Sequence, residues 1–143
     1  MQSMSEFLSA NGWNYTVFLK CFAGPPDDNT ELEAHVGKLL GAKVLVEDLG
    51  IVGEIELLAE ITESLSFVGS NAEGVEPELI DSIEFRTHLS EVTDEVKHLV
   101  GVSDTVRRIN IVEGHPAYPV FWDFSFLFKG GTHSTLFVGC SSD

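Results

Sequence analysis

Carboxylates are the reactive side chains that this sequence gathers most densely. Between residues 47 and 95 the chain contains fourteen Asp and Glu residues but only one basic residue, Arg86. Over all 143 residues, 23 acidic side chains against 8 Lys and Arg give a formal net charge of −15. Such a field repels nucleic acid and anionic membranes, and it attracts and steers basic proteins. The charge therefore predicts a basic protein partner, with no direct contact to nucleic acid or membrane.

Nine acidic residues are the candidates for partner binding, and all but one lie in the acidic middle of the chain. They are Glu54, Glu56, Glu60, Glu63, Glu76, Glu78, Asp81, Glu84 and Asp123. A run of Glu on a helix is often a solvated face, but a small domain needs a net charge of only about 2–8 for solubility. Asp123 interrupts an apolar strand, and a solvent-facing charge that protects a sheet edge is the alternative for it.

The other reactive side chains do not have the spacing that catalysis or metal binding requires. No stretch matches a phosphate-binding loop, a nucleophile elbow or a calcium-binding loop. His88 and His98 are ten residues apart, a spacing that does not place them on one helix face. Cys21 and Cys140 lie in predicted strands, which favours reduced, buried thiols, although neighbouring strands would allow them to pair. We therefore predict a protein without enzymatic activity, cofactor or metal site.

Hydrophobic periodicity predicts the elements that position these side chains. Alternating apolar residues indicate a strand over 14–23. Thr30 and Glu33 have the capping-box spacing of a helix start, and Gly41 is a typical helix end. We therefore expect a helix between Thr30 and Gly41, followed by a short strand over 42–47.

The acidic middle is predicted to be mainly helical. In 51–65 apolar residues recur every three or four positions, which favours a helix, although alternation at the start leaves a strand open. The segment 66–76 is rich in breaker residues and is expected to be a loop. Two further helices are expected, the first from Pro77 and the second from Ser90 or Thr93.

A β-hairpin is expected near the C-terminus, over about 118–140. In its first strand the even-numbered residues are all large and apolar, which is the alternation of a strand with one buried face. With 130–131 as a two-residue glycine turn, Phe124 would lie opposite Phe137. The odd-numbered face is mixed, so partial cover is expected there. A further strand is expected over 105–112.

These elements predict an α+β fold for residues 1–143 as a single domain. The expected architecture is a mostly antiparallel sheet of about five strands, with the acidic helices packed on one face and the hairpin at the end. The candidates for a shared core are Phe18, Phe22, Phe124, Phe126, Phe128 and Phe137.

The leading functional hypothesis is a non-catalytic binding protein that neutralises a basic partner. Its most concrete form is a bacterial immunity protein that caps a toxin, such as a nuclease whose active site is basic because it binds phosphate. A phage-type inhibitor that mimics DNA would have the same composition. The alternative is a small-molecule-binding or sensory domain with an aromatic-lined pocket near Trp13, Trp122 or Phe124.

The sequence also predicts location and assembly. Residues 1–11 have neither the basic start nor the apolar core of a secretion signal, and no stretch is apolar for long enough to span a membrane. We therefore expect a cytoplasmic protein. An edge strand exposed at 132–140 would allow a homodimer, or a sheet shared with the partner.

Overall fold

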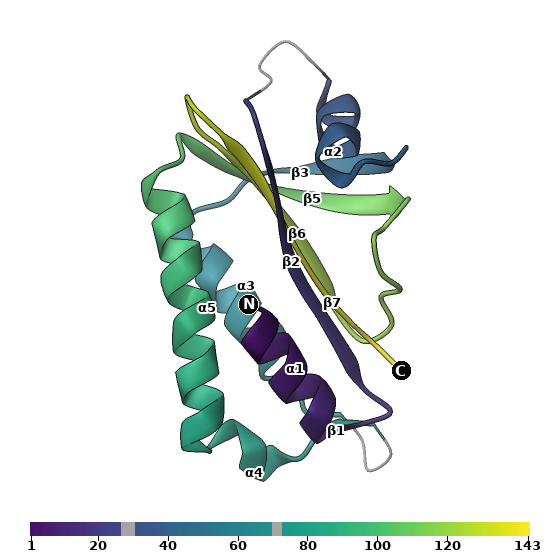
Figure 1. Ribbon diagram of the computed structural model, residues 1–143, viewed down its shortest axis with the longest axis vertical. Helices are drawn as coiled ribbons and strands as arrows, with labels where there is room; N and C mark the ends of the chain where they lie inside the picture. The colour runs from purple at the N-terminus through teal and green to yellow at the C-terminus, as the bar shows by residue number, and fades with distance from the viewer. Residues whose placement is uncertain (27–30, 70–72) are drawn as a thin grey trace.

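The centre of the computed structural model, which describes residues 1–26, 31–69 and 73–143, is an antiparallel five-stranded sheet (Figure 1). Its strands, in spatial order, are β2 (Thr16–Gly24), β7 (Ser134–Ser142), β6 (Asp123–Lys129), β5 (Thr105–Glu113) and β3 (Leu45–Ile51). A separate two-stranded ribbon pairs β1 (Gly12–Trp13) with β4 (Gly74–Val75). The expected α+β class and antiparallel sheet are confirmed.

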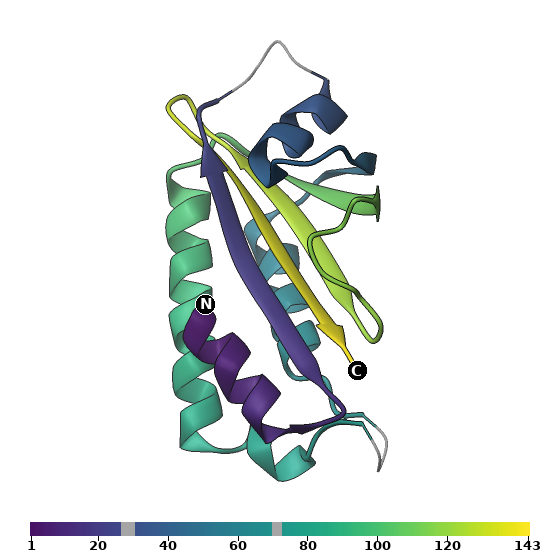
Figure 2. The ribbon, with the colours of Figure 1, turned by 45° about the vertical axis from the view of Figure 1, so that its right-hand side comes forward.

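The helices lie on both faces of this sheet, but unequally (Figure 2). One face is covered by α1 (Gln2–Asn11), α3 (Glu54–Leu65) and α5 (Ile83–Gly101), with the short α4 (Pro77–Ile80) leading into α5. Of the helices in the described ranges, the other face carries only α2 (Leu32–Leu40). The acidic helices thus pack on one face, as expected.

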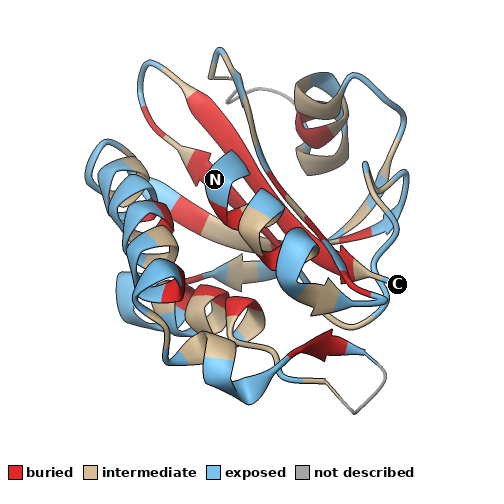
Figure 3. Ribbon diagram, turned by 60° about the horizontal axis from the view of Figure 1, so that its bottom comes forward, coloured by how far each residue is buried: buried red, intermediate tan, exposed pale blue. Residues whose placement is uncertain are grey.

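The central strands are buried on both faces, which explains their nearly continuous apolar sequence (Figure 3). Phe124, Phe126 and Phe128 face the main helical layer together with Phe137. Leu127 faces α2. The four Phe residues on the helical side therefore confirm four of the six residues predicted for the shared core.

Phe18 and Phe22, the other two expected core residues, pack instead on the α2 side of the sheet, where they are half-buried. Both have even numbers on β2, and alternation places them opposite the odd-numbered residues that face the main helices.

The register of the C-terminal hairpin differs from the prediction by two residues. Phe124 lies opposite Gly139 rather than Phe137, and the strand begins at Asp123 rather than near 118. Residues 130–133 connect the two strands, and within this turn Gly130 N–H donates a hydrogen bond to the carbonyl of His133 (3.0 Å). A shift of two residues keeps every side chain on its expected face, since the period of a strand is two.

The middle of the chain is helical as favoured, with different boundaries. The strand expected over 42–47 runs instead from Leu45 to Ile51, so the helix follows at Glu54. The helix expected to begin at Ser90 or Thr93 is part of α5, which already begins at Ile83. Ser82 caps α5 there and accepts a hydrogen bond from Phe85 N–H (3.1 Å).

Two further expectations concern side-chain caps and sheet edges. The capping box includes Thr30, which lies outside the described residues. Glu33 accepts a hydrogen bond from Val46 N–H (3.1 Å) and so links α2 to β3.

The prediction that 132–140 forms an exposed edge strand is wrong. This segment forms β7, which lies between β2 and β6, and the outer strands are β2 and β3.

The hairpin register yields a stability prediction. A Cβ atom at Gly139 would lie 2.3 Å from Cζ of Phe124, so Gly139→Ala should lower the free energy of unfolding by about 1–3 kcal/mol. Urea denaturation measures this. Gly131→Ala is the control, because no atom of the described residues lies within 4 Å of its added Cβ. Adding Phe124→Leu should recover part of the loss, and equal stability of both alanine variants would contradict the register.

Candidate partner-binding surface

The exposed acids of α3 result from a simple helical pattern. Leu57, Ile61 and Leu65, spaced by four residues, are completely buried and fix the inner side of the helix. Glu54, Glu56 and Glu63 are therefore exposed, as predicted. The described part of the chain offers none of these three an ion pair.

Glu60 differs from the other candidates on α3. It is half-buried, and its Oε2 lies 2.5 Å from Nη2 of Arg108 on β5. Its charge is thereby largely compensated within the protein. Glu60 is consequently better explained as a link between α3 and the sheet than as a contact for a partner.

A second acidic group surrounds α4. Pro77 fits the first turn of α4 and Ser82 caps α5, so the chain turns sharply between the two helices. The four acids of this turn are all exposed, and no ion pair within the described residues neutralises them. They are Glu76, Glu78, Asp81 and Glu84.

The indole of Trp13 lies beside this second group. Trp13 is 68% exposed. Glu76 and Glu78 line two hollows of about 550 and 360 Å³ that both include Trp13, and Glu73 lines the smaller one. We call Trp13, Glu73, Glu76 and Glu78 the Trp13 surface.

Local backbone geometry explains why Trp13 points outward. Asn14 has a positive φ of 44°, which turns the chain between exposed Trp13 and buried Tyr15. Across the ribbon Trp13 pairs with Gly74, which has no side chain to cover the indole. The only sequence signals of this arrangement were Gly12 and Asn14 on either side of Trp13.

The nine candidates do not form one site. Glu54 and Glu56 are in the first turn of α3, a helix of 12 residues and hence about 18 Å long, and the Trp13 surface follows its far end. Asp123 lies opposite Cys140 on the α2 side of the sheet, away from the acidic helices. The structure therefore joins Glu76 and Glu78 with Trp13, and separates them from Asp123.

The remaining ion pairs compensate only a few acids. Asp48 accepts two hydrogen bonds from Nη1 of Arg107 (2.8 and 2.9 Å), which lower the pKa of this carboxyl. Glu95 lies 3.8 Å from the N-terminal ammonium, and Glu91 lies 3.8 Å from Nδ1 of His88. The field over the acidic helices thus remains negative.

Two other groups with possible chemistry are accounted for by packing. Trp122 donates a hydrogen bond from Nε1 to the hydroxyl of Tyr15 (2.6 Å), and its ring stacks on Phe124. Phe124 is only 3% exposed, so the aromatic face expected to hold a ligand is filled by its own rings. Burial lowers the pKa of His115, whose Nδ1 accepts a hydrogen bond from Ala117 N–H (3.0 Å).

The two thiols are free. Cys21 faces the main helical layer and Cys140 the opposite side of the sheet, so the strands hold them apart although β2 and β7 are neighbours. Burial raises the pKa of both thiols to about 11. Across the described ranges, no cluster of three or more His, Cys, Asp or Glu could hold a metal ion.

Comparisons with known proteins do not place this chain in a family. No protein-family model matches it, and no curated protein or solved structure shows significant similarity to it. Among the helices that the structure describes, none has the length and apolar character needed to cross a bilayer. The function must therefore be inferred from the chain's own geometry.

The raised pKa values predict unreactive thiols. At pH 8 a thiol with a pKa near 11 is about one part in a thousand ionised, whereas an ordinary thiol is about one part in four ionised. The ionised fractions differ about 250-fold, but the thiolate of a higher-pKa thiol is the stronger nucleophile, so Cys21 and Cys140 should react with a disulfide reagent about 20-fold more slowly than free cysteine. The protein unfolded in urea is the control and should react at the ordinary rate. Rapid labelling of either thiol in the folded protein would contradict this.

Proposed function

We propose that this protein is a non-catalytic binding protein that neutralises a basic protein partner. The observation that carries the proposal is the Trp13 surface, where an exposed indole lies between hollows lined by uncompensated Glu76 and Glu78. A large aromatic side chain that water surrounds in the isolated protein is a typical anchor of a binding interface.

The Trp13 surface suits a partner rich in Lys and Arg for two reasons. The face of an indole attracts a cation, and Trp is the aromatic residue that does so best. The carboxylates of Glu73, Glu76 and Glu78 can pair with the same cations or with their neighbours. The acids of α3 add a longer-range attraction that speeds the encounter without contact.

The class of partner follows from the same charge. A nuclease has a basic active site because it must bind phosphate, and an acidic protein that covers this site prevents substrate from binding. We therefore propose a bacterial immunity protein or another toxin inhibitor as the concrete function, acting in the cytoplasm. A phage-type DNA mimic would use the same surface against a DNA-binding protein, and the identity of the captured partner separates the two.

The small-molecule alternative is less well supported. Its pocket was expected near Trp13, Trp122 or Phe124, but Phe124 and Trp122 are packed against other rings. The hollows beside Trp13 are lined by carboxylates, which favour a basic group over a neutral apolar ligand.

Electrostatic binding predicts a difference between two acidic sets of equal charge. The partner is first captured from host extract at low salt, and its association rate is then measured at several salt concentrations. Glu76→Gln, Glu78→Gln and Asp81→Asn together should slow association about tenfold at low salt and weaken its salt dependence. The matched control combines Glu54→Gln, Glu56→Gln and Glu63→Gln, which should slow it about two- to threefold. Association that is insensitive to salt and to both sets would refute the proposal.

The anchor role of Trp13 predicts a loss of affinity without loss of fold. Trp13→Ala should weaken partner binding about 30-fold, which corresponds to a hot spot of about 2 kcal/mol. Because Trp13 is exposed, the melting temperature should stay nearly constant. Tyr118→Ala is the control, since Tyr118 is also a highly exposed aromatic residue (77%) and lies away from the acidic turn. Equal effects of the two substitutions on affinity would argue against Trp13 as the anchor.

A further inference from the structure

Some of the outward-facing backbone groups of β2 are hydrogen-bonded within the protein. β2 is an outer strand of the sheet, and among the described strands it is bonded only to β7. At Val17 its N–H donates to Oγ of Ser9 (2.9 Å), and its carbonyl accepts from Oγ of Ser5 (2.5 Å). Val17 thus turns both backbone groups away from β7. In an antiparallel strand this orientation repeats every second residue, so those of Leu19, Cys21 and Ala23 also face outward.

The helix that supplies these serines covers only the first part of the edge. α1 runs antiparallel to β2, and its start lies level with Cys21, where Sγ is 3.7 Å from Sδ of Met1 (Figure 2). Beyond this point Ala23 is exposed. Within the described residues, nothing accepts from its outward N–H or donates to its carbonyl. The last part of β2 therefore presents backbone groups to solvent.

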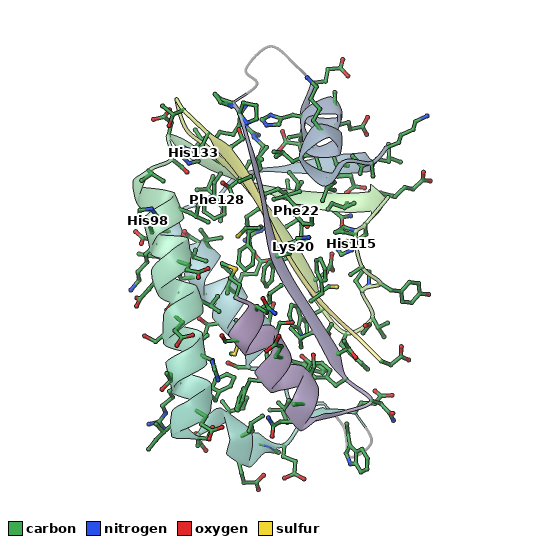
Figure 4. The ribbon with its side chains drawn as sticks, in the orientation of Figure 1. Lys20, Phe22, His98, His115, Phe128 and His133 are labelled. Carbon is green, nitrogen blue, oxygen red and sulfur yellow. The ribbon has the colours of Figure 1, made fainter. Side chains whose placement is uncertain are left out.

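A hollow adjoins this open part of the edge. It has a volume of about 510 Å³ and lies between β2 and α5, with Cys21, Ala23 and Leu99 among its walls. Lys20 and Phe22 project to the other side of the sheet, and His98 marks the α5 wall (Figure 4). A strand added beside Ala23 would direct alternate side chains into this hollow.

Charge decides which segment fits there. Asp94 and Glu95 line the hollow, and the chain's own N-terminal ammonium already lies 3.8 Å from Glu95. A second copy of this chain would bring two such acidic pairs together, on molecules that each carry a net charge of −15. The segment that fits has an apolar side chain, which fills the hollow, and Lys or Arg two residues to either side. These cations pair with Asp94 and Glu95.

We infer that the edge of β2 from Cys21 to Gly24, with the adjoining hollow, is a docking site for an extended basic segment of the partner, which joins the sheet as a sixth strand. This inference rests on the proposed function, because it assumes a basic protein partner. It adds a second contact that recognises backbone as well as charge.

The test uses a peptide that carries only the inferred features. The acetylated and amidated heptapeptide Thr-Lys-Thr-Val-Thr-Lys-Thr places Lys, Val and Lys on one side of a strand. Titrated into the isotope-labelled protein at millimolar concentration, it should shift the backbone amides of 21–24 and slow hydrogen exchange at Ala23. The matched peptide with Glu in place of Lys should bind at least tenfold more weakly, and equal binding would overturn the charge argument.

Ala23→Pro removes the outward N–H and leaves the bonds to β7, which are made by the even-numbered residues of β2. It should weaken peptide binding about tenfold, whereas Ala23→Ser, which keeps the N–H, should change it less than about twofold. Should Ala23→Pro not fold, Leu99→Lys is the second variant. It places a cation in the hollow and should also reduce affinity about tenfold.

The possible failures can be told apart. Peptide binding that is unchanged in Ala23→Pro and Leu99→Lys, or amide shifts confined to the Trp13 surface, would overturn the β2 site and leave the proposed function standing. The proposed function fails instead if association with the partner is insensitive to salt and to the acidic substitutions around α4. Sedimentation that shows a dimer, lost in Ala23→Pro, would identify a second copy as the occupant and overturn the inference.

Discussion

Strands β6 and β7 are buried on both faces, and this burial fixes where every helix can lie. Phe124 packs over Gly139 on one side, while Leu127 and Leu136 meet on the other. A sheet with two apolar faces needs cover on both, so α1, α3 and α5 must lie on one side and α2 on the other. The apolar side of each helix then packs against the sheet, and its acidic side chains lie on the outer surface.

This division explains how a strongly acidic chain forms an ordinary core. Carboxylates are costly to bury, and in the acidic helices they occupy the positions between the buried Leu, Ile and Val residues. Glu60 shows the exception, because its partner Arg108 allows it to reach towards the sheet. The consequence is a molecule whose negative field comes mainly from α3, the turn around α4, and α5.

Two features would add specificity to this electrostatic attraction, and both are groups that the rest of the fold leaves uncovered. Trp13 is exposed because its ribbon partner is Gly74, and the end of β2 is open because α1 begins only at the level of Cys21. Charge alone accelerates encounter but gives little specificity of pose. An aromatic anchor and an unpaired strand edge would fix the orientation of a bound partner. The anchor would do so through its indole face, and the strand edge through backbone hydrogen bonds.

Local periodicity and composition were enough to predict the fold class, the alternation of β6, the helical character of 51–65 and the location of the acids. The hairpin register could not be predicted in this way, since a four-residue turn and a two-residue turn leave the same faces buried. Tertiary structure also decided that Asp123 lies apart from the helical acids and that Arg108 compensates Glu60. The exposure of Trp13 and the open end of β2 depend on which distant segment covers each residue, and for Trp13 the neighbouring Gly12 and Asn14 were the only local signals.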